Sequence, residues 1–549
     1  MRIALAQLNP TVGDLAGNRR LVEEAAAKAA SERADLLVVP EMVLTGYPPM
    51  DLLERDGFVR DQLRELDALT RSSRQVAIAL GAVLPAGGSV RGAWQNACVL
   101  LAGGRRVAAR AKTHLPTYDV FDERRYFAPA ERREPVPFGD GGTVLGLTVC
   151  EDTWVEAQGY AVDPAGELAR AGATIILNPS CSPWHAGKAL ERRGMIARLA
   201  ARHATPIVFV NQVGGNDELI FDGGSFVADG AGRVHGVLPL FDAAFGIVDL
   251  PAGEPGLAPD AVDEPDRTAQ LEAGLVLGIR DYFGKQGLPP GAVIGLSGGI
   301  DSAVTAHLAV AALGPERVLG IAMPSPFSSP HSIEDALAVG RNLGIETRVV
   351  AIEPIFRAYL DVFRALFGKR SDYGLAQQNI QSRIRGAILM AVSNAEHRLV
   401  LATGNKSELS VGYCTLYGDT VGGLAVLGDV YKRDVYAIAR RANALAGSER
   451  IPARSIAKPP SAELAPNQLD SDDLPDYAVL DAILAQAIEG RLGAAAIEPP
   501  PGADRALVNQ VVARLDRNEY KRRQTPLVLR TSTKAFGTGR RLPIVHRYQ

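Results

Sequence analysis

A glycine-rich turn between an apolar run and a helix-like run is the feature that most constrains this chain. Residues 295–302 read GLSGGIDS, which ends the apolar run AVIGL and leads into SAVTAHLAVAAL. The backbone N–H groups of Ser297, Gly298 and Gly299 can form a small nest at a helix N-terminus, where the helix dipole favours an anion. We therefore expect a strand–turn–helix unit that holds a phosphate group.

The residues of this turn limit the kind of phosphate site that it can form. The turn has no GK[ST] sequence, so it is not the common P-loop, and it lacks the third glycine of a dinucleotide fingerprint. The hydroxyls of Ser297 and Ser302 can donate to phosphate oxygens. The carboxylate of Asp301 would be repelled by phosphate, so we expect a Mg²⁺ ion between the two. On these residues alone, an ordinary structural turn remains the alternative.

The charge balance and the cysteines exclude several classes of protein. The chain has 549 residues, 59 of them basic and 62 acidic, and a formal net charge of −3, which argues against a nucleic-acid partner. Cys98, Cys150, Cys181 and Cys414 form no CxxC pair, so we expect neither a zinc site nor a disulfide framework, and we expect a cytoplasmic location. No apolar run reaches about 18 residues, so no membrane partner is expected.

The chain reads as two α/β domains joined by a linker. Apolar runs predict strands at 3–8, 35–40, 76–84, 97–103, 144–150, 174–179 and 206–212, and Ala-rich runs predict helices at 18–34 and 194–204. Further strands are predicted at 292–299, 317–324, 347–352 and 399–404. The run PAGEPGLAPDAVDEPD is rich in Pro, Gly and acid. We therefore expect domains at residues 1–248 and 269–549, with a linker at 249–268.

The turn SGGIDS resembles the pyrophosphate loop, SGGxDS, of the ATP-pyrophosphatases. Members of that group cleave ATP between the α and β phosphates, so the resemblance implies adenylation of an acceptor and release of pyrophosphate. It also implies that ATP is bound by the residues of the loop. These are Gly295, Leu296, Ser297, Gly298, Gly299, Ile300, Asp301 and Ser302.

Stretches downstream of the loop resemble NAD synthetases, in the order in which that family carries them. The stretches are NIQSRIRG, LATGNKSELSVGYCTLYGD, GDVYKRDVY, KPPSAEL and the tail KRRQTPLVLRTSTKAFGTGRRLPI. The resemblance implies ATP contacts from Thr403, Lys432 and Ser461, deamido-NAD contacts from Asn379, Arg383, Glu408 and Lys534, and a magnesium site at Asp301 and Glu408. Leu416 stands where the ammonia-only synthetases carry a lysine, which agrees with a glutamine-using branch but leaves the contacts of residues 416–423 open.

Three stretches of the N-terminal half resemble the nitrilase superfamily and, within it, the glutaminase domain of glutamine-dependent NAD synthetases. They are VVPEMVLTGYPPMDLL, KTHLPTYDVFDERRYF and LTVCEDTW. The resemblance implies a catalytic triad of Glu41, Lys112 and Cys150, and glutamine contacts from Tyr118, Glu151, Ser182 and Lys188. The implied fold is a nitrilase-like α-β-β-α sandwich, followed by a Rossmann-like, doubly wound parallel sheet of the ATP-pyrophosphatase type.

Together the two resemblances imply a glutamine-hydrolysing NAD(+) synthetase, which acts in the last step of NAD biosynthesis. Such an enzyme amidates deamido-NAD through an adenylated intermediate and gives NAD, AMP, pyrophosphate and glutamate. The family also implies ammonia transfer through a tunnel and a symmetric homo-oligomer, either a dimer or an octamer. Two alternatives remain on the sequence: amidation of another carboxylate or a nucleic acid, and a sensor of glutamine or ATP without activity.

Overall fold

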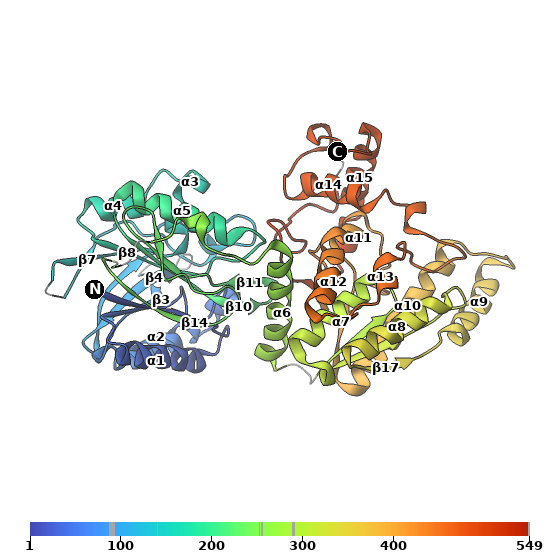
Figure 1. The fold of residues 1–549 in the computed structure, drawn as a ribbon, viewed down its shortest axis with the longest axis horizontal. Helices are drawn as coiled ribbons and strands as arrows, with labels where there is room; N and C mark the ends of the chain where they lie inside the picture. The colour runs from blue at the N-terminus through green and yellow to red at the C-terminus, as the bar shows by residue number, and fades with distance from the viewer. Residues whose placement is uncertain (87–93, 140, 252, 254–255, 288–290, 547–549) are drawn as a thin grey trace. The chain divides into compact units, whose positions relative to one another are not determined.

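The computed structural model describes residues 1–86, 94–139, 141–251, 253, 256–287 and 291–546 (Figure 1). The chain divides into two compact units, Met1–Glu264 and Pro265–Gln549. The second unit opens with helix α6 (Arg267–Gln286), which Asp266 caps by accepting the N–H of Ala269. No helix in the described ranges combines the length and the apolar character needed to cross a membrane.

Two six-stranded sheets form the first unit, with the orders β14-β1-β2-β3-β4-β5 and β13-β12-β9-β8-β7-β6. The first sheet contains β1 (Arg2–Gln7), β2 (Leu36–Val38), β3 (Ala77–Pro85), β4 (Trp94–Ala102), β5 (Arg105–Ala111) and β14 (Ala244–Asp249). The second contains β6 (Val136–Phe138), β7 (Thr143–Leu147), β8 (Ile175–Ser180), β9 (Ile207–Asn211), β12 (Phe226–Ala228) and β13 (Val234–His235). A separate hairpin pairs β10 (Val213–Asn216) with β11 (Leu219–Asp222).

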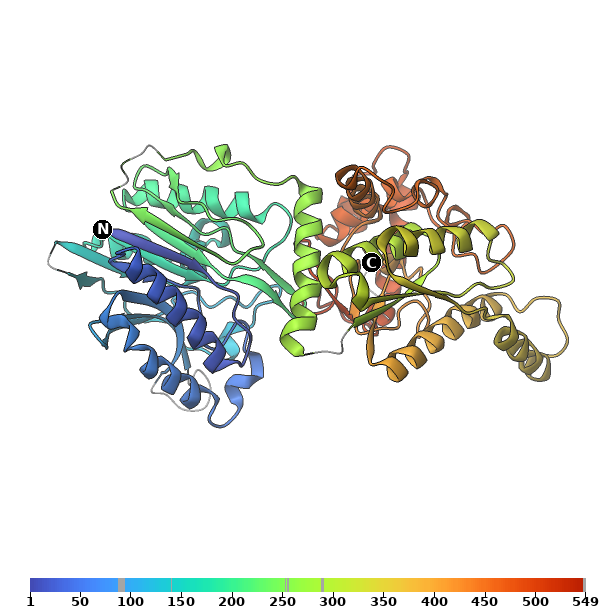
Figure 2. The same ribbon diagram turned by 60° about the horizontal axis from the view of Figure 1, so that its bottom comes forward.

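Alternation along β1 determines how the first unit is layered. Ile3 and Leu5 enter a core that also contains Leu177 and Val208 of the second sheet, whereas Ala4 packs in the core beneath the helices. Helices α1 (Leu15–Ser31) and α2 (Phe58–Leu69) lie on one side of the paired sheets, and α4 (Pro164–Arg170) and α5 (Lys188–His203) lie on the other (Figures 1 and 2). This arrangement confirms the α-β-β-α sandwich.

The second unit is built on an all-parallel sheet with the order β17-β16-β15-β18-β19-β20. Its strands are β15 (Gly291–Leu296), β16 (Val318–Ala322), β17 (Glu346–Val349), β18 (Arg398–Ala402), β19 (Leu424–Ala425) and β20 (Leu527–Val528). The order reverses between β15 and β18, and ligands of such sheets bind outside the carboxyl ends of the strands at that point. The predicted doubly wound sheet is confirmed, and the turn of residues 295–302 lies at this point.

Helices cover the parallel sheet and form a cap beside it. The helices of the second unit after α6 are α7 (Ile300–Leu313), α8 (Pro330–Leu343), α9 (Glu353–Phe367), α10 (Leu375–Glu396), α11 (Lys406–Val411), α12 (Lys432–Ala446), α13 (Ala453–Ala457), α14 (Tyr477–Ile488), α15 (Arg505–Arg517) and α16 (Glu519–Arg522). Helices α14 and α15 pack on α11 around an apolar cluster that includes Leu409 and Leu480 (Figure 1). A short α3 (Val155–Gln158) completes the helices of the first unit.

Candidate active sites

The structure brings Glu41, Lys112 and Cys150 together inside the first unit. Glu41 follows β2, Lys112 follows β5, and Cys150 begins a short 3-10 helix after β7. The Lys112 Nζ lies 2.9 Å from the Glu41 Oε1, and all three side chains are buried. Cys150 has a φ of 41°, an unfavourable backbone conformation for a residue with a side chain, of the kind often found at functional sites.

Burial and neighbouring charges set the ionisation of this group. Burial raises the pKa of the Cys150 thiol well above its usual value, the Glu41 carboxylate raises it further, and Lys112 opposes both. Burial also acts to lower the pKa of Lys112, but Glu123 and Glu41 outweigh it and raise that pKa. The resting site therefore contains a neutral thiol beside a fixed ammonium group.

Glu151 occupies the centre of the proposed glutamine contacts. The hydroxyls of Tyr118 and Tyr160 each donate to its Oε1 at 2.9 Å, and burial raises the pKa of this carboxyl. The Lys188 Nζ lies 3.9 Å from the centre of the Trp154 ring, and its charge acts on Glu151 in the opposite direction to burial. The structure thus brings Tyr118 and Lys188 close to Glu151, which directly follows Cys150.

Ser182 follows β8 and is held by hydrogen bonds of its backbone. Its N–H donates to the Asn211 Oδ1 at 2.8 Å, and its carbonyl accepts from the Asn211 Nδ2 at 3.4 Å. The neighbouring Cys181 donates its N–H to the Glu41 Oε2 at 2.8 Å. The segment after β8 therefore positions the Glu41 carboxylate.

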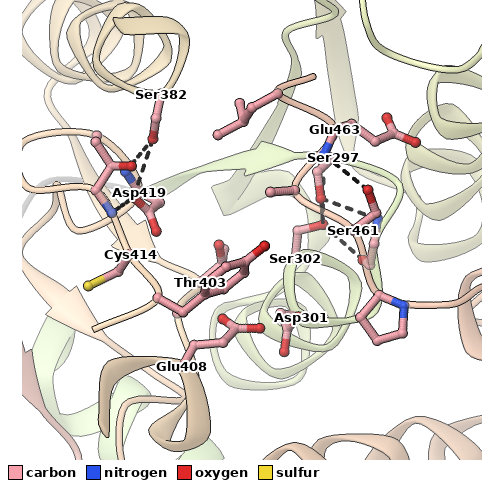
Figure 3. Close-up of a pocket in the computed structure, with 18 of the residues that line it drawn as sticks. Ser297, Asp301, Ser302, Ser382, Thr403, Glu408, Cys414, Asp419, Ser461 and Glu463 are labelled. Atoms are coloured by element: carbon pink, nitrogen blue, oxygen red, sulfur yellow. Dashed lines mark hydrogen bonds between the residues drawn. The ribbon is translucent and has the colours of Figure 1, made fainter. Parts of the chain in front are cut away.

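A cavity of about 840 Å³ lies at the carboxyl ends of the strands in the second unit (Figure 3). Most of the predicted ATP and substrate residues line it: Gly295, Leu296, Ser297, Gly299, Ile300, Asp301, Ser302, Asn379, Thr403, Glu408, Lys432 and Ser461. Among the described residues, Gly298, Arg383 and Lys534 are not part of the lining. The cavity lies where a doubly wound sheet binds its ligands.

The glycine-rich turn is shaped by its own hydroxyls and by close contact with α8. The Ser302 Oγ donates to the Gly299 carbonyl at 3.0 Å, and the Ser297 Oγ accepts from the Gly299 N–H at 3.2 Å. Gly298 has a φ of +79°, and a Cβ there would lie 2.2 Å from the Ser332 carbonyl oxygen. Only glycine fits at 298, and the turn opens onto the N-terminus of α7.

Lys432 joins the two carboxylates of the predicted magnesium site. Its Nζ lies 2.6 Å from the Asp301 Oδ2 and 3.0 Å from the Glu408 Oε1, and the Asn405 Nδ2 donates to the other Asp301 oxygen at 2.9 Å. Figure 3 shows Asp301 and Glu408 directed to the same part of the cavity. Burial raises the pKa of Glu408 to about 7, against the pull of Lys432. Two carboxylates are thus close enough to share one cation.

The remaining predicted residues have different surroundings. Asn379 accepts from the Thr415 hydroxyl at 2.9 Å, and the Arg383 Nε donates to the Leu416 carbonyl at 3.2 Å. The Ser461 Oγ accepts from the Glu463 N–H at 3.1 Å. The Lys534 carbonyl accepts from the Lys406 Nζ at 2.9 Å, which ties the C-terminal tail to α11.

Comparison with known proteins places this pair of sites in one family. The family model of carbon-nitrogen hydrolases matches residues 2–255, and that of NAD synthases matches residues 272–525. The chain is 44% identical to the glutamine-dependent NAD(+) synthetase of Synechocystis, with 100% of this chain and 99% of that protein covered. The chain belongs to the glutamine-dependent NAD(+) synthetase family.

Other members of the glutamine-dependent NAD(+) synthetase family agree over the full length. The Thermotoga maritima protein is 40% identical, with 100% and 99% of the two chains covered. A structure of the Acinetobacter baumannii synthetase in complex with ADP is 36% identical and has a TM-score of 0.77, with 99% and 98% covered. The Cytophaga hutchinsonii synthetase, at 20% identity, has the same fold, with a TM-score of 0.83 and 100% and 98% covered. The family expected from the motifs is confirmed.

The site around Cys150 in this chain contains further polar side chains that the sequence analysis did not predict. The Lys112 Nζ also lies 2.8 Å from the Glu123 Oε1, which accepts from the Tyr47 hydroxyl at 3.0 Å. The Asn96 Nδ2 donates to the Glu41 Oε1 at 2.6 Å. Glu123 belongs to the run KTHLPTYDVFDERRYF that was quoted for Lys112, so its place in that run was the available signal.

Proposed function

We propose that this protein converts deamido-NAD, ATP and glutamine into NAD, AMP, pyrophosphate and glutamate. The observation that carries the proposal is full-length membership of a family whose named members are glutamine-dependent NAD(+) synthetases. The buried Glu41–Lys112–Cys150 group and the cavity beside the SGGIDS turn supply one candidate site for each half of the reaction. We place the reaction in the cytoplasm, with small molecules as substrates.

Glutamine hydrolysis is assigned to Cys150, Glu41 and Lys112. The Cys150 thiol attacks the side-chain carbonyl carbon of glutamine while Glu41 takes the thiol proton, because the raised pKa disfavours a free thiolate. The ammonium group of Lys112 stabilises the negative charge that forms on the carbonyl oxygen. Glu41 passes this proton to the amide nitrogen, which leaves as ammonia, and a thioester remains. The Glu41 carboxylate then takes a proton from the water that attacks the thioester, and glutamate and the thiol are released.

The α-amino and α-carboxylate groups of glutamine are assigned to opposite charges. Glu151, held by two tyrosine hydroxyls, suits the ammonium group, and Lys188 suits the carboxylate. Tyr118 fixes Glu151, and Ser182 lies on the segment that orients Glu41. This assignment explains the choice of an amino-acid amide over a simple amide, because both charged ends would have a partner.

The second unit is assigned the adenylation of deamido-NAD. The nicotinate carboxylate of deamido-NAD attacks the α-phosphorus of ATP, pyrophosphate leaves, and ammonia then displaces AMP from the mixed anhydride. The turn of residues 295–302 would hold the phosphates, with Thr403, Lys432 and Ser461 as further ATP contacts. Asn379, Arg383, Glu408 and Lys534 are assigned to deamido-NAD, of which Arg383 and Lys534 lie outside the cavity lining.

Asp301 and Glu408 are proposed to hold Mg²⁺, since both accept from one Lys432 ammonium group and two carboxylates suit a hard cation. The ion would neutralise negative charge on the phosphates. Asn405 keeps Asp301 turned toward the cavity, and the Tyr477 hydroxyl donates to the Glu408 Oε1 at 3.2 Å. These contacts orient both carboxylates before a nucleotide arrives.

Product analysis tests the proposed function directly. The protein is mixed with Mg²⁺, ATP and deamido-NAD, together with glutamine, with ammonium, or with no nitrogen source, and the products are separated by chromatography. We expect NAD and AMP with either nitrogen source, and glutamate with glutamine. Absence of NAD under every condition would refute the assignment of deamido-NAD as the acceptor.

Cys150→Ala separates the two sites within the same assay. The variant is expected to lose glutamine-dependent NAD formation by at least about 1000-fold and to keep the ammonium-dependent reaction, because only the nucleophile is removed. Cys98→Ala is the matched control, since Cys98 is a buried core residue of β4 that has no assigned part in glutamine hydrolysis. Loss of both reactions in Cys150→Ala alone would contradict the two-site assignment.

A further inference from the structure

Arg385 is a cation in the second-unit cavity that none of the preceding assignments uses. It lies on α10, and residues three or four positions apart on one face of this helix line the cavity. The residues of α10 that line the cavity are Leu375, Gln378, Asn379, Ser382, Arg385, Gly386 and Leu389. Arg383 lies on another side of the helix, where it donates to the Leu416 carbonyl. The two arginines of the run NIQSRIRG therefore have different contacts, and only Arg385 lines the cavity.

Within the part of the chain that the structure describes, the Arg385 guanidinium donates a single hydrogen bond. Its Nε donates to the Met323 carbonyl at 3.0 Å. Burial lowers the pKa of Arg385 to about 10, partly opposed by the charge of Glu463. The Glu463 carboxylate is itself engaged by the Lys458 Nζ at 2.5 Å and by the Ser332 hydroxyl at 2.8 Å. Among the described residues, no carboxylate forms an ion pair with Arg385.

The other cations lining the cavity are already engaged. Lys432 pairs with Asp301 and Glu408, and Arg514 pairs with Asp473. The Lys521 Nζ donates to the carbonyls of Gly412 and Cys414 at 2.7 and 2.8 Å. A partly buried guanidinium without a carboxylate is costly unless a ligand supplies the negative charge. Among the described cavity cations, Arg385 and Lys521 thus have no carboxylate partner, and the Lys521 ammonium group is held by two carbonyls, which leaves the Arg385 guanidinium as the better candidate for a bound anion.

Strand register places Arg385 beside the glycine-rich turn. In the parallel pair β15–β16, Leu296 lies opposite Ala322. The next residues along these strands are Ser297, which begins the turn, and Met323, whose carbonyl holds the Arg385 Nε. An anion held by the turn therefore lies at the same sheet edge as the guanidinium, which can bind two phosphate oxygens at once.

We propose that Arg385 binds the phosphate groups of ATP, opposite the N–H groups of the SGGIDS turn. The proposal rests on the proposed function and adds a residue to the ATP half of the site. Deamido-NAD also carries phosphates, but the arginine assigned to deamido-NAD is Arg383, which lies on the side of α10 that faces Leu416. Arg385 would compensate the charge that moves onto pyrophosphate as the α–β bond breaks.

Arg385→Met tests the proposal with two readouts. We expect the KM for ATP to rise by at least about tenfold, because a charge-assisted hydrogen bond is lost, while the KM values for deamido-NAD and glutamine stay within about twofold. Inorganic pyrophosphate is expected to raise the Tm of the unmodified protein but not of the variant. Arg341→Met in the exposed last turn of α8 removes the same charge and is expected to change neither readout.

Three outcomes would overturn the proposal. They are equal protection of Arg385→Met and the unmodified protein by pyrophosphate, a rise in the KM for deamido-NAD alone, and a lowered Tm with an unchanged KM for ATP. If Arg385→Met does not fold, Arg385→Lys keeps the charge without the planar fork and should weaken pyrophosphate protection at least about threefold. Pyrophosphate binding is measured without turnover. A failure of the Arg385 proposal can therefore be told apart from a failure of the proposed function, in which the unmodified protein would form no NAD.

Discussion

At the scale of single residues, Lys112 is held between two buried carboxylates, Glu41 and Glu123. Only one of them can accept the thiol proton while the other keeps the ammonium group in place. Burial raises the pKa of Glu123 to about 7, since the loss of hydration outweighs the pull of Lys112. Glu123 therefore keeps its proton to a higher pH than an exposed glutamate does.

Replacement of Glu123 by Gln is expected to affect only the glutamine half of the reaction. The glutamine-dependent rate should fall about 10- to 100-fold, because a charge-assisted contact to Lys112 is lost, and the ammonium-dependent rate should stay unchanged. The raised pKa also favours the folded state at low pH, a contribution lost as pH rises through about 7. The Tm of Glu123→Gln should therefore change less across that range. Equal loss of both rates would assign Glu123 a general structural role.

The sequence predicted side chains that belong to motifs and missed those that only support them. Glu41, Lys112 and Cys150 were identified because the stretches around them resemble the nitrilase superfamily, whereas their positions after strands would not have revealed them. Glu123 stands in the charged run DERRYF, where an acidic side chain is usually solvated, and only tertiary packing makes it buried. Arg385 was missed for a related reason, because its distance from Met323 depends on how α10 packs on β16.

At the scale of elements, the turn between β15 and α7 depends on Gly298. A methyl group at this position would meet the Ser332 carbonyl oxygen at 2.2 Å, and the φ of +79° strains any other residue. Gly298→Ala should therefore shift the turn or α8 and raise the KM for ATP at least about tenfold, with the glutaminase rate unchanged. Steady-state kinetics with each substrate varied in turn measure both effects.

Gly284→Ala in α6 is the matched control for this prediction. A Cβ at Gly284 meets nothing within 4 Å, and the residue lies inside a helix. The change is expected to stabilise the fold by up to about 1 kcal/mol and to leave the KM for ATP unchanged. An unaltered KM for ATP in Gly298→Ala would show that the turn does not need its glycine.

Strands were predicted from apolar runs, and this method found the centres of the sheets more readily than their edges. In the first sheet, β5 and β14 are the two edge strands, and neither was predicted. The residues of β5, RRVAARA, are partly exposed because only one neighbouring strand and little core cover them. Edge strands need no continuous apolar run, so a pattern of burial alone cannot reveal them.

At the scale of the whole molecule, helix α9 has apolar side chains on both of its faces. Phe356 and its neighbours pack in the core of the second unit, whereas a second stripe at helical spacing is exposed. The residues of the exposed stripe are Ile355, Tyr359, Val362 and Leu366, at 44, 40, 51 and 68% exposure. A contiguous apolar stripe of this kind is typical of a contact surface.

A second copy of this chain is the partner that the charges beside the stripe favour. Along α9 the signs alternate as Glu353, Arg357, Asp361 and Arg364. An antiparallel copy of the helix would place Glu353 opposite Arg364 and Arg357 opposite Asp361, so each charge would meet its opposite. We therefore propose that the expected homo-oligomer includes a two-fold contact through α9.

Val362→Glu with Leu366→Glu is expected to divide the oligomer at this contact. Two acidic side chains on this stripe would place charge against apolar side chains of the copy and lose buried area, so the mass from light scattering should halve. Leu445→Glu changes an isolated exposed leucine on α12 and should leave the mass unaltered. An unchanged mass in the double variant, or a monomeric unmodified protein, would reject α9 as the contact. A halved mass with retained glutaminase activity would show that the first unit functions independently of this assembly.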